Sequence, residues 1–450
     1  MSAGLLGRVW SELGRPPAEL DGYERPAVPL AARLDCARLA ADSVAAAALA
    51  GAVASGHPDA TALRLSGARI ATAFQSERVF ALDGRPWRAF APLSGFFATA
   101  DGWVRPHGNY PWHAEALRSA LLLGQDAGAD DARGRFARLG TEEACLLVTA
   151  AGGLCVPVRV EGRGDTAARV ATPVLEVDRL GDAAVRAILG GAAGPLAGVR
   201  ILDLTRVIAG PVATRTLALL GAEVLRLDPP ALTEIPEQHL DSGAGKRSAL
   251  LDVRSAAGAA RLHELLDGAD ALVVGYRPAA LAELGLTASR LAAEHPGLVV
   301  AELSAWGSEG AEAERRGFDS LVQAESGISL VEGSVSPGAL PAQALDHGTG
   351  YLLAAAVVTL LERQRREGGT WRVRASLRRT AAELLAGART IEPEPVGITD
   401  AARLTETVEL PTAAGVLRTA APAVSWRDGP SSWPAPPETW GSAEPRWTRR

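Results

Sequence analysis

Apolar, strand-like runs alternate with helical segments between Leu196 and about Ala386, and this alternation constrains the fold more than any other feature of the chain. The run at 198–205, GVRILDLT, has a continuous apolar core typical of a parallel strand buried on both faces. The stretch at 210–222 then has helical spacing and ends near a glycine. Further strands are predicted at 223–230, 270–276 and 297–307. The pattern predicts an α/β fold with an open, mostly parallel sheet covered by helices on both sides.

Four loops follow the predicted strands at their carboxyl ends. Sheets of this kind bind ligands in the crevice outside the carboxyl ends of their strands. We therefore expect the four loops to share one edge of the sheet and to line a ligand site. They comprise residues 205–211, 226–230, 274–278 and 304–310.

The remaining segments are less regular. The sequence predicts a long alanine-rich helix at 34–54, a hairpin around the turn at 100–102, a helix at 110–124 and a second hairpin near 150–160. We expect five parts: an N-terminal arm at 1–30, a helix-strand segment at 31–85, a small α+β domain at 86–193, a sheet domain at 194–390 and an irregular tail at 391–450. The tail is rich in Pro, Ser and Trp, which predicts a surface segment with little secondary structure.

Two stretches of the chain share an order of features. Residues 34–74 and residues 345–384 each begin with Leu-Asp and continue with an alanine-rich helix, a glycine-containing turn, a short strand and a second helix. Two interpretations stay open. The similarity reflects either a shared alanine-rich composition or a duplicated or permuted segment.

Composition excludes several classes of protein. The 46 basic and 52 acidic residues give a formal charge of −6 without a long basic block, so a nucleic-acid partner is not expected. The chain has three cysteines, an odd number, and none of them has CxxC spacing. This pattern argues against a disulfide framework. Charged residues interrupt the apolar runs near the N-terminus, so we expect neither a leader nor a membrane partner. A cytoplasmic protein is expected.

Four ordered blocks, at 194–230, 245–286, 295–329 and 345–369, closely resemble the family III CoA-transferases. That family also includes CoA-dependent racemases of α-methyl acyl thioesters. The resemblance implies a Rossmann-like sheet domain with a smaller α+β domain, coenzyme A as a substrate, acyl-CoA and carboxylate partners, no metal, and a homodimer as one possible assembly. The stretch at 96–124 resembles the start of the family's small domain, which ordinarily follows the sheet domain. The resemblance therefore implies that the domain order is reversed in this chain.

An acidic residue, Asp346, stands just before Gly348, Gly350 and a long apolar run. The resemblance implies that Asp346 is the nucleophile that attacks the acyl-CoA thioester, giving an aspartyl anhydride and then an aspartyl-CoA thioester. Such chemistry needs a stabilised oxyanion and a dry site, and the glycines are expected to expose backbone N–H groups and admit the acyl group. Taken without the surrounding blocks, Asp346 is read as a helix N-cap.

Basic residues near the expected loops are candidates for holding coenzyme A, because phosphates favour Arg forks and Lys point charges. Each arginine taken alone is better explained as a solvated surface residue. By resemblance, the CoA-contacting set comprises Arg206, Lys246, Arg247, Gly275, Tyr276, Arg277 and Arg316.

Some positions depart from the family pattern. Phe318 stands where the racemases carry a proton-accepting His, and His347 is expected to point away from the face that presents Asp346. His107 and Asn109 are candidates for the mouth of the site, although satisfied loop residues are the simpler interpretation. Two alternatives to CoA transfer therefore remain: a non-catalytic acyl-CoA-binding protein or partner subunit, and an acyl-CoA racemase.

Overall fold

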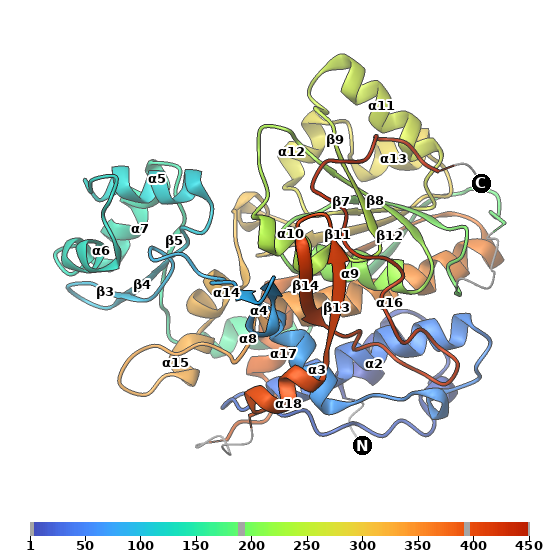
Figure 1. The fold of residues 1–450 in the computed structure, drawn as a ribbon, viewed down its shortest axis with the longest axis horizontal. Coiled ribbons are helices and arrows are strands. Elements are labelled where there is room, and N and C mark those ends of the chain that lie inside the picture. The colour runs from blue at the N-terminus through green and yellow to red at the C-terminus, as the bar shows by residue number, and fades with distance from the viewer. Residues whose placement is uncertain (1–3, 188–193, 391–396, 449–450) are drawn as a thin grey trace.

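A seven-stranded sheet forms the centre of the molecule (Figure 1). The computed structural model describes residues 4–187, 194–390 and 397–448. The strand order is β6-β12-β11-β10-β7-β8-β9, and β6 runs antiparallel to β12 whereas the other pairs are parallel. The strands are β6 (Glu176–Gly181), β7 (Arg200–Leu204), β8 (Glu223–Asp228), β9 (Lys246–Leu250), β10 (Ala271–Val274), β11 (Val299–Ser304) and β12 (Thr370–Ser376). The predicted α/β fold with a mostly parallel sheet is confirmed.

Helices cover both faces of this sheet. One face packs against α9 (Ala209–Leu219) and α16 (Ala344–Glu367), and the other against α11 (Ala256–Asp267), α12 (Pro278–Glu283) and α13 (Ala288–Glu294). Successive residues of a strand point to opposite faces. In β10, Ala271 and Val273 join the core under α16, whereas Leu272 and Val274 join the core under α11. Burial on both faces explains why the strand sequence is apolar without alternation.

The two alanine-rich helices of the similar stretches pack directly against each other. Helix α2 (Cys36–Ala54) contacts α16 over much of its length, and both belong to one continuous core. Among the described residues, these two helices are long and apolar enough to pass a membrane-span test, but 83% and 100% of their tested windows are buried inside the molecule. Helices α2 and α16 are therefore buried in the way that is typical of core helices.

The two similar stretches differ after these helices. Strand β12 and helix α17 (Leu377–Leu385) follow α16 as expected. In the N-terminal stretch, helix α3 (Gly67–Phe74) forms, but the expected short strand is reduced to an isolated bridge between Leu63 and Trp426. The expectation of a strand there was wrong, because no strand in the described part of the chain pairs with this segment beyond that bridge.

A smaller α+β unit extends away from the sheet and appears in cyan in Figure 1. It contains β3 (Phe97–Ala98), β4 (Trp103–Pro106), β5 (Cys155–Pro157), α5 (Pro111–Ala120), α6 (Ala129–Phe136) and α7 (Thr141–Ala150), packed around its own hydrophobic core. The predicted hairpin around 100–102 is confirmed by the antiparallel pairing of β3 with β4. The predicted second hairpin was wrong, because β5 pairs with the distant β4 and is preceded by α7.

The C-terminal tail is more regular than the sequence suggested. Residues 400–420 form α18 (Asp400–Thr405), β13 (Thr407–Thr412) and β14 (Gly415–Ala420), and the hairpin joins a sheet with β1 (Ala81–Leu82) and β2 (Arg85–Pro86) in the order β13-β14-β1-β2. The expectation of an irregular tail was therefore wrong for this part. The hairpin is fixed by pairing with β1, about 330 residues earlier in the chain, which no local pattern reveals.

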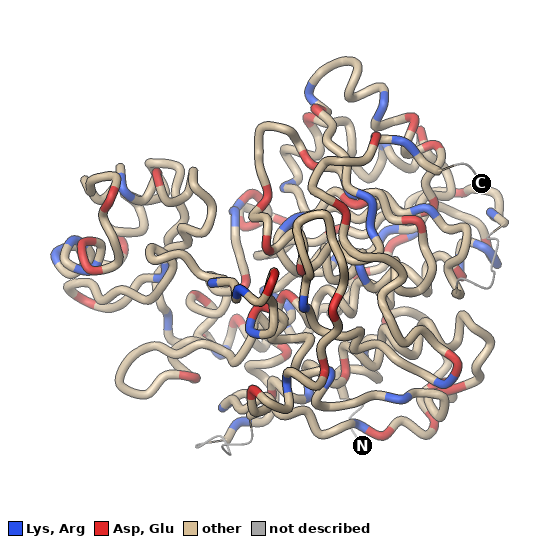
Figure 2. The backbone as a smooth tube through the Cα atoms, in the orientation of Figure 1, with Lys and Arg blue, Asp and Glu red and all other residues tan. Residues whose placement is uncertain are grey.

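The other helices complete the packing around the sheet. Helix α1 buries Leu5, Leu6, Val9 and Trp10 in the core next to α2. Basic and acidic residues are interspersed over the molecule in the view of Figure 2. The remaining elements are α1 (Leu5–Glu12), η1 (Pro17–Leu20), η2 (Ala60–Ala62), α4 (Ser76–Val79), α8 (Arg163–Val170), α10 (Pro236–Ser242), η3 (Ala311–Glu314), α14 (Asp319–Ser326) and α15 (Ile328–Glu332).

Candidate active site

Asp346 lies in the first turn of α16, where two cavities meet. Its side chain is buried, with 6% of the residue exposed, and it lines both an outer cavity of about 340 Å³ and an inner cavity of about 60 Å³. The Asp346 side chain is not a helix cap, because Gln343 occupies the N-cap position and no side-chain cap bond forms. A carboxylate in the first turn faces the positive end of the helix dipole.

The glycines after Asp346 serve helix packing. A Cβ atom at Gly350 would lie 2.5 Å from the carbonyl oxygen of Ala209 in α9, and one at Gly348 would lie 3.2 Å from Leu39 in α2. Their small size therefore lets α16 approach its two neighbours. The expectation that these glycines make room for an acyl group is not supported by this geometry.

A second buried carboxylate accompanies Asp346. The Oδ2 atom of Asp319 accepts a hydrogen bond from the backbone N–H of Asp346 at 2.9 Å, and Gln323 donates to the other carboxylate oxygen. Burial raises the pKa of Asp346 well above its usual value, and the neighbouring Asp319 charge raises it further. Burial also raises the pKa of Asp319, although hydrogen bonds from Asp346 and Gln323 oppose the change. The two groups therefore resist carrying two negative charges at once.

The outer cavity opens at the carboxyl edge of the sheet, as the strand-end loops predicted. Residues from the loops after β7, β10 and β11 line it, together with side chains from the smaller α+β unit. None of the residues 226–230 lines it, so three of the four expected loops share this site. Those from the smaller unit are Tyr110, Trp112, His113 and Leu154.

Five of the seven residues expected to contact CoA line the outer cavity: Arg206, Gly275, Tyr276, Arg277 and Arg316. Arg206 is held in place by the carbonyl oxygens of Leu232 and Thr233, at 2.7 and 2.9 Å, and its guanidinium lies 5.3 Å from the Tyr110 ring centre. Arg316 donates to the carbonyl oxygen of Gly152 at 2.8 Å, which ties the sheet domain to the smaller unit. Arginines are thus part of the wall of this cavity.

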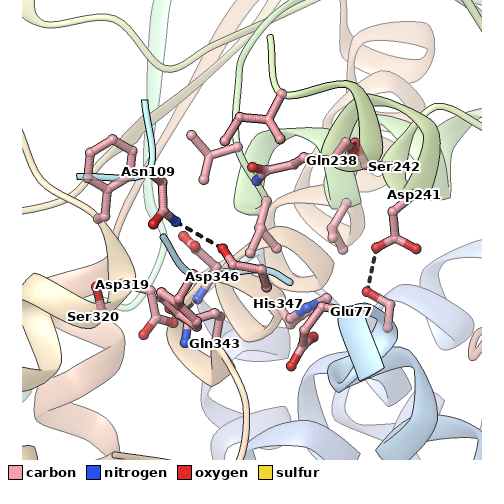
Figure 3. Close-up of a pocket in the computed structure, with 18 of the residues that line it drawn as sticks. Glu77, Asn109, Gln238, Asp241, Ser242, Asp319, Ser320, Gln343, Asp346 and His347 are labelled. Carbon is pink, nitrogen blue, oxygen red and sulfur yellow. Dashed lines mark hydrogen bonds between the residues drawn. The ribbon is translucent and has the colours of Figure 1, made fainter. Parts of the chain in front are cut away.

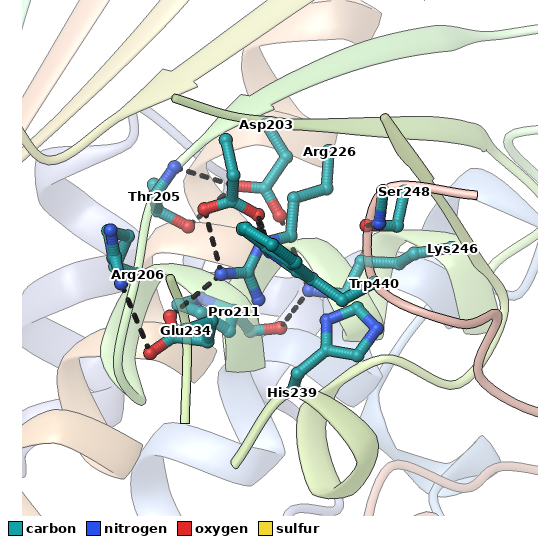
Figure 4. Close-up of polar contacts among 12 residues, drawn as sticks. Asp203, Thr205, Arg206, Pro211, Arg226, Glu234, His239, Lys246, Ser248 and Trp440 are labelled. Atoms are coloured by element: carbon teal, nitrogen blue, oxygen red, sulfur yellow. Dashed lines mark hydrogen bonds and ion pairs between the residues drawn. The ribbon is translucent and has the colours of Figure 1, made fainter. Parts of the chain in front are cut away.

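The structure does not bring Lys246 and Arg247 to the cavity. Lys246 is buried and its ammonium contacts the carboxylate of Asp203 at 3.3 Å and the hydroxyl of Thr214 at 2.8 Å (Figure 4). Burial lowers the pKa of Lys246 to about 8. Arg247 binds the carbonyl oxygen of Arg446 at 2.6 Å. The expectation failed because the sequence analysis did not recognise β9: both residues begin this strand, so their backbone lies at the amino edge of a parallel sheet.

Figure 4 shows a buried ionic network that includes Arg206 of the outer cavity wall. Arg226 of β8 contacts Glu234 at 2.8 Å and Asp228 at 2.7 Å, and Glu234 also contacts Arg206 at 3.5 Å. The indole N–H of Trp440, from the tail, donates to Asp228 at 3.0 Å. The network fixes the position of Arg206, the cation at the cavity wall.

The inner cavity is small and largely enclosed by polar and aromatic side chains (Figure 3). At about 60 Å³ it has room for roughly four water-sized groups. Its lining includes Asn109, Gln238, Gln343, His347 and Phe318. Such a space suits a short acyl group better than a nucleotide.

Two buried histidines line the inner cavity. The His107 ring stacks on Phe318 with ring centres 3.9 Å apart, and His347 stacks on Phe74 at 5.2 Å. Burial lowers the pKa of each to about 3, and the Nδ1 atom of each has no hydrogen-bond partner among the described residues. His347 and Asp346 both line the inner cavity, whereas the outer cavity is lined by Asp346 and not by His347. The expectation that His347 points away from the face that presents Asp346 was therefore wrong.

Sequence reasoning missed Asp319, Arg315 and Trp112 as site residues. Asp319 directly follows Phe318 in a block already singled out, so the adjacent carboxylate was a signal that could have been used. Arg315 lines the outer cavity beside Arg316. Trp112 lines the outer cavity and stacks on Tyr110 at 4.7 Å.

Comparison with known proteins shows similarity over part of the chain. Residues 196–403 match the family model described as CoA-transferase family III. The chain is 32% identical over 191 residues to a "Probable fatty acyl-CoA transferase" of Mycobacterium tuberculosis, covering 39% of this chain and 48% of that protein. It is 32% identical over 189 residues to a "Succinyl-CoA:glutarate CoA-transferase" of Mus musculus, covering 38% and 43%.

The similarity is partial in length. A crystal structure of the M. tuberculosis protein matches with 31% identity and a TM-score of 0.41, covering 43% of this chain and 58% of that chain. The chain thus spans about half the length of the curated relatives it matches. The segment at 196–403, which contains Asp346 and the strand-end loops, is thus similar to CoA-transferase family III.

Proposed function

We propose that this protein transfers CoA from an acyl-CoA to a carboxylic acid through covalent intermediates on Asp346. The single observation that carries the proposal is the position of Asp346, which lines an outer cavity rimmed by arginines and a small inner cavity at once. A thioester carbonyl must lie at such a junction, because the CoA arm and the acyl group extend from it in opposite directions. The names of the relatives support the same reaction class.

The chemistry uses two exchanges at the same carboxylate. An Asp346 oxygen attacks the thioester carbonyl, the C–S bond breaks, and CoA leaves as a thiolate while an aspartyl anhydride remains. The thiolate then attacks the aspartyl carbonyl, which releases the first carboxylate and leaves an aspartyl-CoA thioester. The acceptor carboxylate attacks this thioester to form a new anhydride, and the retained thiolate attacks its acceptor carbonyl. The products are the acceptor's CoA thioester and free Asp346.

The surroundings of Asp346 suit these steps. Burial excludes water from an anhydride that water would hydrolyse. The N-terminal turn of α16 directs its positive dipole end toward charge that develops on the reacting carbonyl. Asp319 holds the backbone N–H of Asp346 and so positions the nucleophile.

CoA is assigned to the outer cavity. Its phosphates would meet Arg206, Arg277 and Arg316, and the cavity volume of about 340 Å³ exceeds that of the inner one several-fold. The smaller α+β unit of the same chain supplies Tyr110 and Trp112 to the wall, so one chain contains both halves of the proposed site. This arrangement predicts activity from a single chain whether or not it forms a homodimer.

Trapping of the aspartyl intermediate tests the proposal. Purified protein is incubated with a panel of acyl-CoA donors and hydroxylamine or borohydride, and the peptide containing Asp346 is examined by mass spectrometry. We expect modification at Asp346 and loss of CoA exchange in Asp346→Asn. Asp35→Asn is the matched control, because Asp35 caps α2 of the similar stretch and Asn caps a helix equally well.

The two outcomes separate transfer from simple binding. Exchange that persists in Asp346→Asn contradicts the proposed nucleophile. CoA binding without exchange or trapping, in the wild-type protein and across the donor panel, would instead identify a non-catalytic acyl-CoA-binding protein.

Proton exchange at the α-carbon of an acyl-CoA is a second candidate function. It is favoured by His107, a neutral buried imidazole that stacks on Phe318 and lines the inner cavity with Asp346. Incubation in D₂O distinguishes the two reactions, because this second function introduces deuterium at the α-carbon and CoA transfer does not. Deuterium uptake that is lost in His107→Gln would support it.

A further inference from the structure

A second group of reactive side chains lies on the far face of the sheet, where the end of α13 meets α11. His263 belongs to α11, Glu294 is the last residue of α13, and His295 follows it. Their ligand atoms all lie within 4.8 Å of one another. The His263 Nδ1 atom is 2.9 Å from His295 Nε2 and 3.6 Å from Glu294 Oε2.

A carboxylate fixes the orientation of the buried histidine. The Nδ1 atom of His295 lies 2.9 Å from Oδ1 of Asp267. Because an ionised carboxylate only accepts hydrogen bonds, His295 carries its proton on Nδ1 and turns the Nε2 lone pair toward His263. Carboxylates that hold the far nitrogen of a ligating histidine are a regular feature of metal sites.

We propose that His263 Nδ1, His295 Nε2 and Glu294 Oε2 bind a divalent zinc ion, with Asp267 positioning His295. Two nitrogens at the zinc bond length of about 2.0–2.1 Å in a tetrahedral site lie about 3.3 Å apart. The two nitrogens lie 2.9 Å apart, close to that value, and Glu294 Oε2 lies 3.6 Å from His263 Nδ1. Metal binding needs the His263 proton on Nε2, which remains free to carry it.

The surroundings favour a transition metal. Two imidazole nitrogens and one carboxylate suit Zn²⁺, whereas Mg²⁺ and Ca²⁺ prefer oxygen ligands throughout. Arg290 binds the other oxygen of Glu294, Oε1, at 2.7 Å and so leaves Oε2 for the ion. The side chains of His263 and Glu294 are 26% and 41% exposed, which gives the ion a route from solvent and a water a place in the fourth position.

The proposed zinc site is structural and lies apart from the candidate active site. None of its residues lines the cavities around Asp346. The ion would connect α11 to the end of α13 and stabilise the layer that covers this face of the sheet. Zinc binding is therefore independent of the proposed transfer reaction.

Zinc titration of the full-length protein tests the inference. After treatment with EDTA and dialysis, the chain is titrated with ZnCl₂ by calorimetry and with CoCl₂ by visible absorption. We expect one zinc per chain, a raised melting temperature with zinc, and tetrahedral cobalt bands. His263→Asn and Glu294→Gln should each weaken binding at least tenfold, and Asp267→Asn should weaken it about 10–100-fold.

A control variant and three outcomes decide the matter. His57→Gln removes a histidine outside the cluster and should leave zinc affinity unchanged. Absence of one-to-one binding would overturn the inference, and so would binding that survives in the double variant His263→Asn/Glu294→Gln. Cobalt spectra with thiolate charge-transfer bands would also overturn it by assigning the metal to cysteines. None of these results bears on CoA exchange.

Discussion

Replacement of Asp319 by Asn should change the pH dependence of the first transfer step. The Asp319 carboxylate accepts the Asp346 N–H bond at 2.9 Å, and its charge raises the pKa of the nucleophile. A like charge within about 4–6 Å shifts a carboxyl pKa by about one to three pH units, and each unit corresponds to about 1.4 kcal/mol. Asn keeps an oxygen acceptor for the N–H bond but removes the charge. The Asp346 carboxyl should then ionise at lower pH.

Single-turnover kinetics provide the assay. The rate of CoA release from an acyl-CoA is measured by a thiol reagent between pH 4 and pH 9, with the wild-type protein losing rate as Asp346 becomes protonated. In Asp319→Asn this acidic limb should move to lower pH by at least about one unit. Asp241→Asn is the control, because Asp241 lines the inner cavity but bonds Ser76 and Thr419 instead of Asp346. An unchanged limb in Asp319→Asn, or an equal movement in Asp241→Asn, would refute the reasoning.

The same pair affects stability with a defined sign. Burial raises both carboxyl pKa values in the folded chain, so the folded state binds more protons than the unfolded state near neutral pH. Folding stability from this pair is therefore present at low pH and is lost as pH rises through the raised pKa values. Urea unfolding at pH 5 and pH 8 should show a smaller loss in Asp319→Asn than in the wild-type protein. A loss of the same size would contradict the coupling.

Three further changes probe the site walls and the tail. Arg206→Gln removes a charged hydrogen bond to the substrate worth about 1.5–3 kcal/mol, so KM for acyl-CoA should rise about 10–100-fold. Arg247→Gln is the control and should leave KM unchanged. Lys246→Met leaves its buried carboxylate partner unpaired and should lower the free energy of unfolding by about 3–5 kcal/mol without raising KM. Trp440→Phe removes the hydrogen bond to Asp228 and should lower the free energy of unfolding, measured in urea, by about 1.5–3 kcal/mol. An unchanged urea midpoint would show that this tail contact does not stabilise the fold.

The arrangement of the proposed site within one chain follows from packing between distant segments. Helix α2 and helix α16 lie side by side although about 300 residues separate them, and the smaller unit at 97–157 reaches the outer cavity from the N-terminal half. The order of domains along the chain therefore does not prevent their contact. A measurement of CoA exchange against protein concentration would show whether the single chain suffices.

The sequence by itself determined the sheet and the position of the candidate nucleophile. Strands β7, β8, β10 and β11 are recognisable because burial on both faces demands continuous apolar runs, and the parallel order places their following loops at one edge. Asp346 is recognisable because it begins a long apolar helix within a block of family resemblance. These features depend on residues that are near one another in the chain.

Only the tertiary structure decided which polar groups meet. The sequence predicted that Lys246 and Arg247 line the cavity. In the structure both begin β9, where Lys246 forms a buried ion pair with Asp203 and Arg247 binds the C-terminal tail. Asp319 became the partner of Asp346 because α14 packs beside the start of α16. The physical reason is that pairing, burial and charge compensation depend on distances across the fold, and local patterns of hydrophobicity carry no information about those distances.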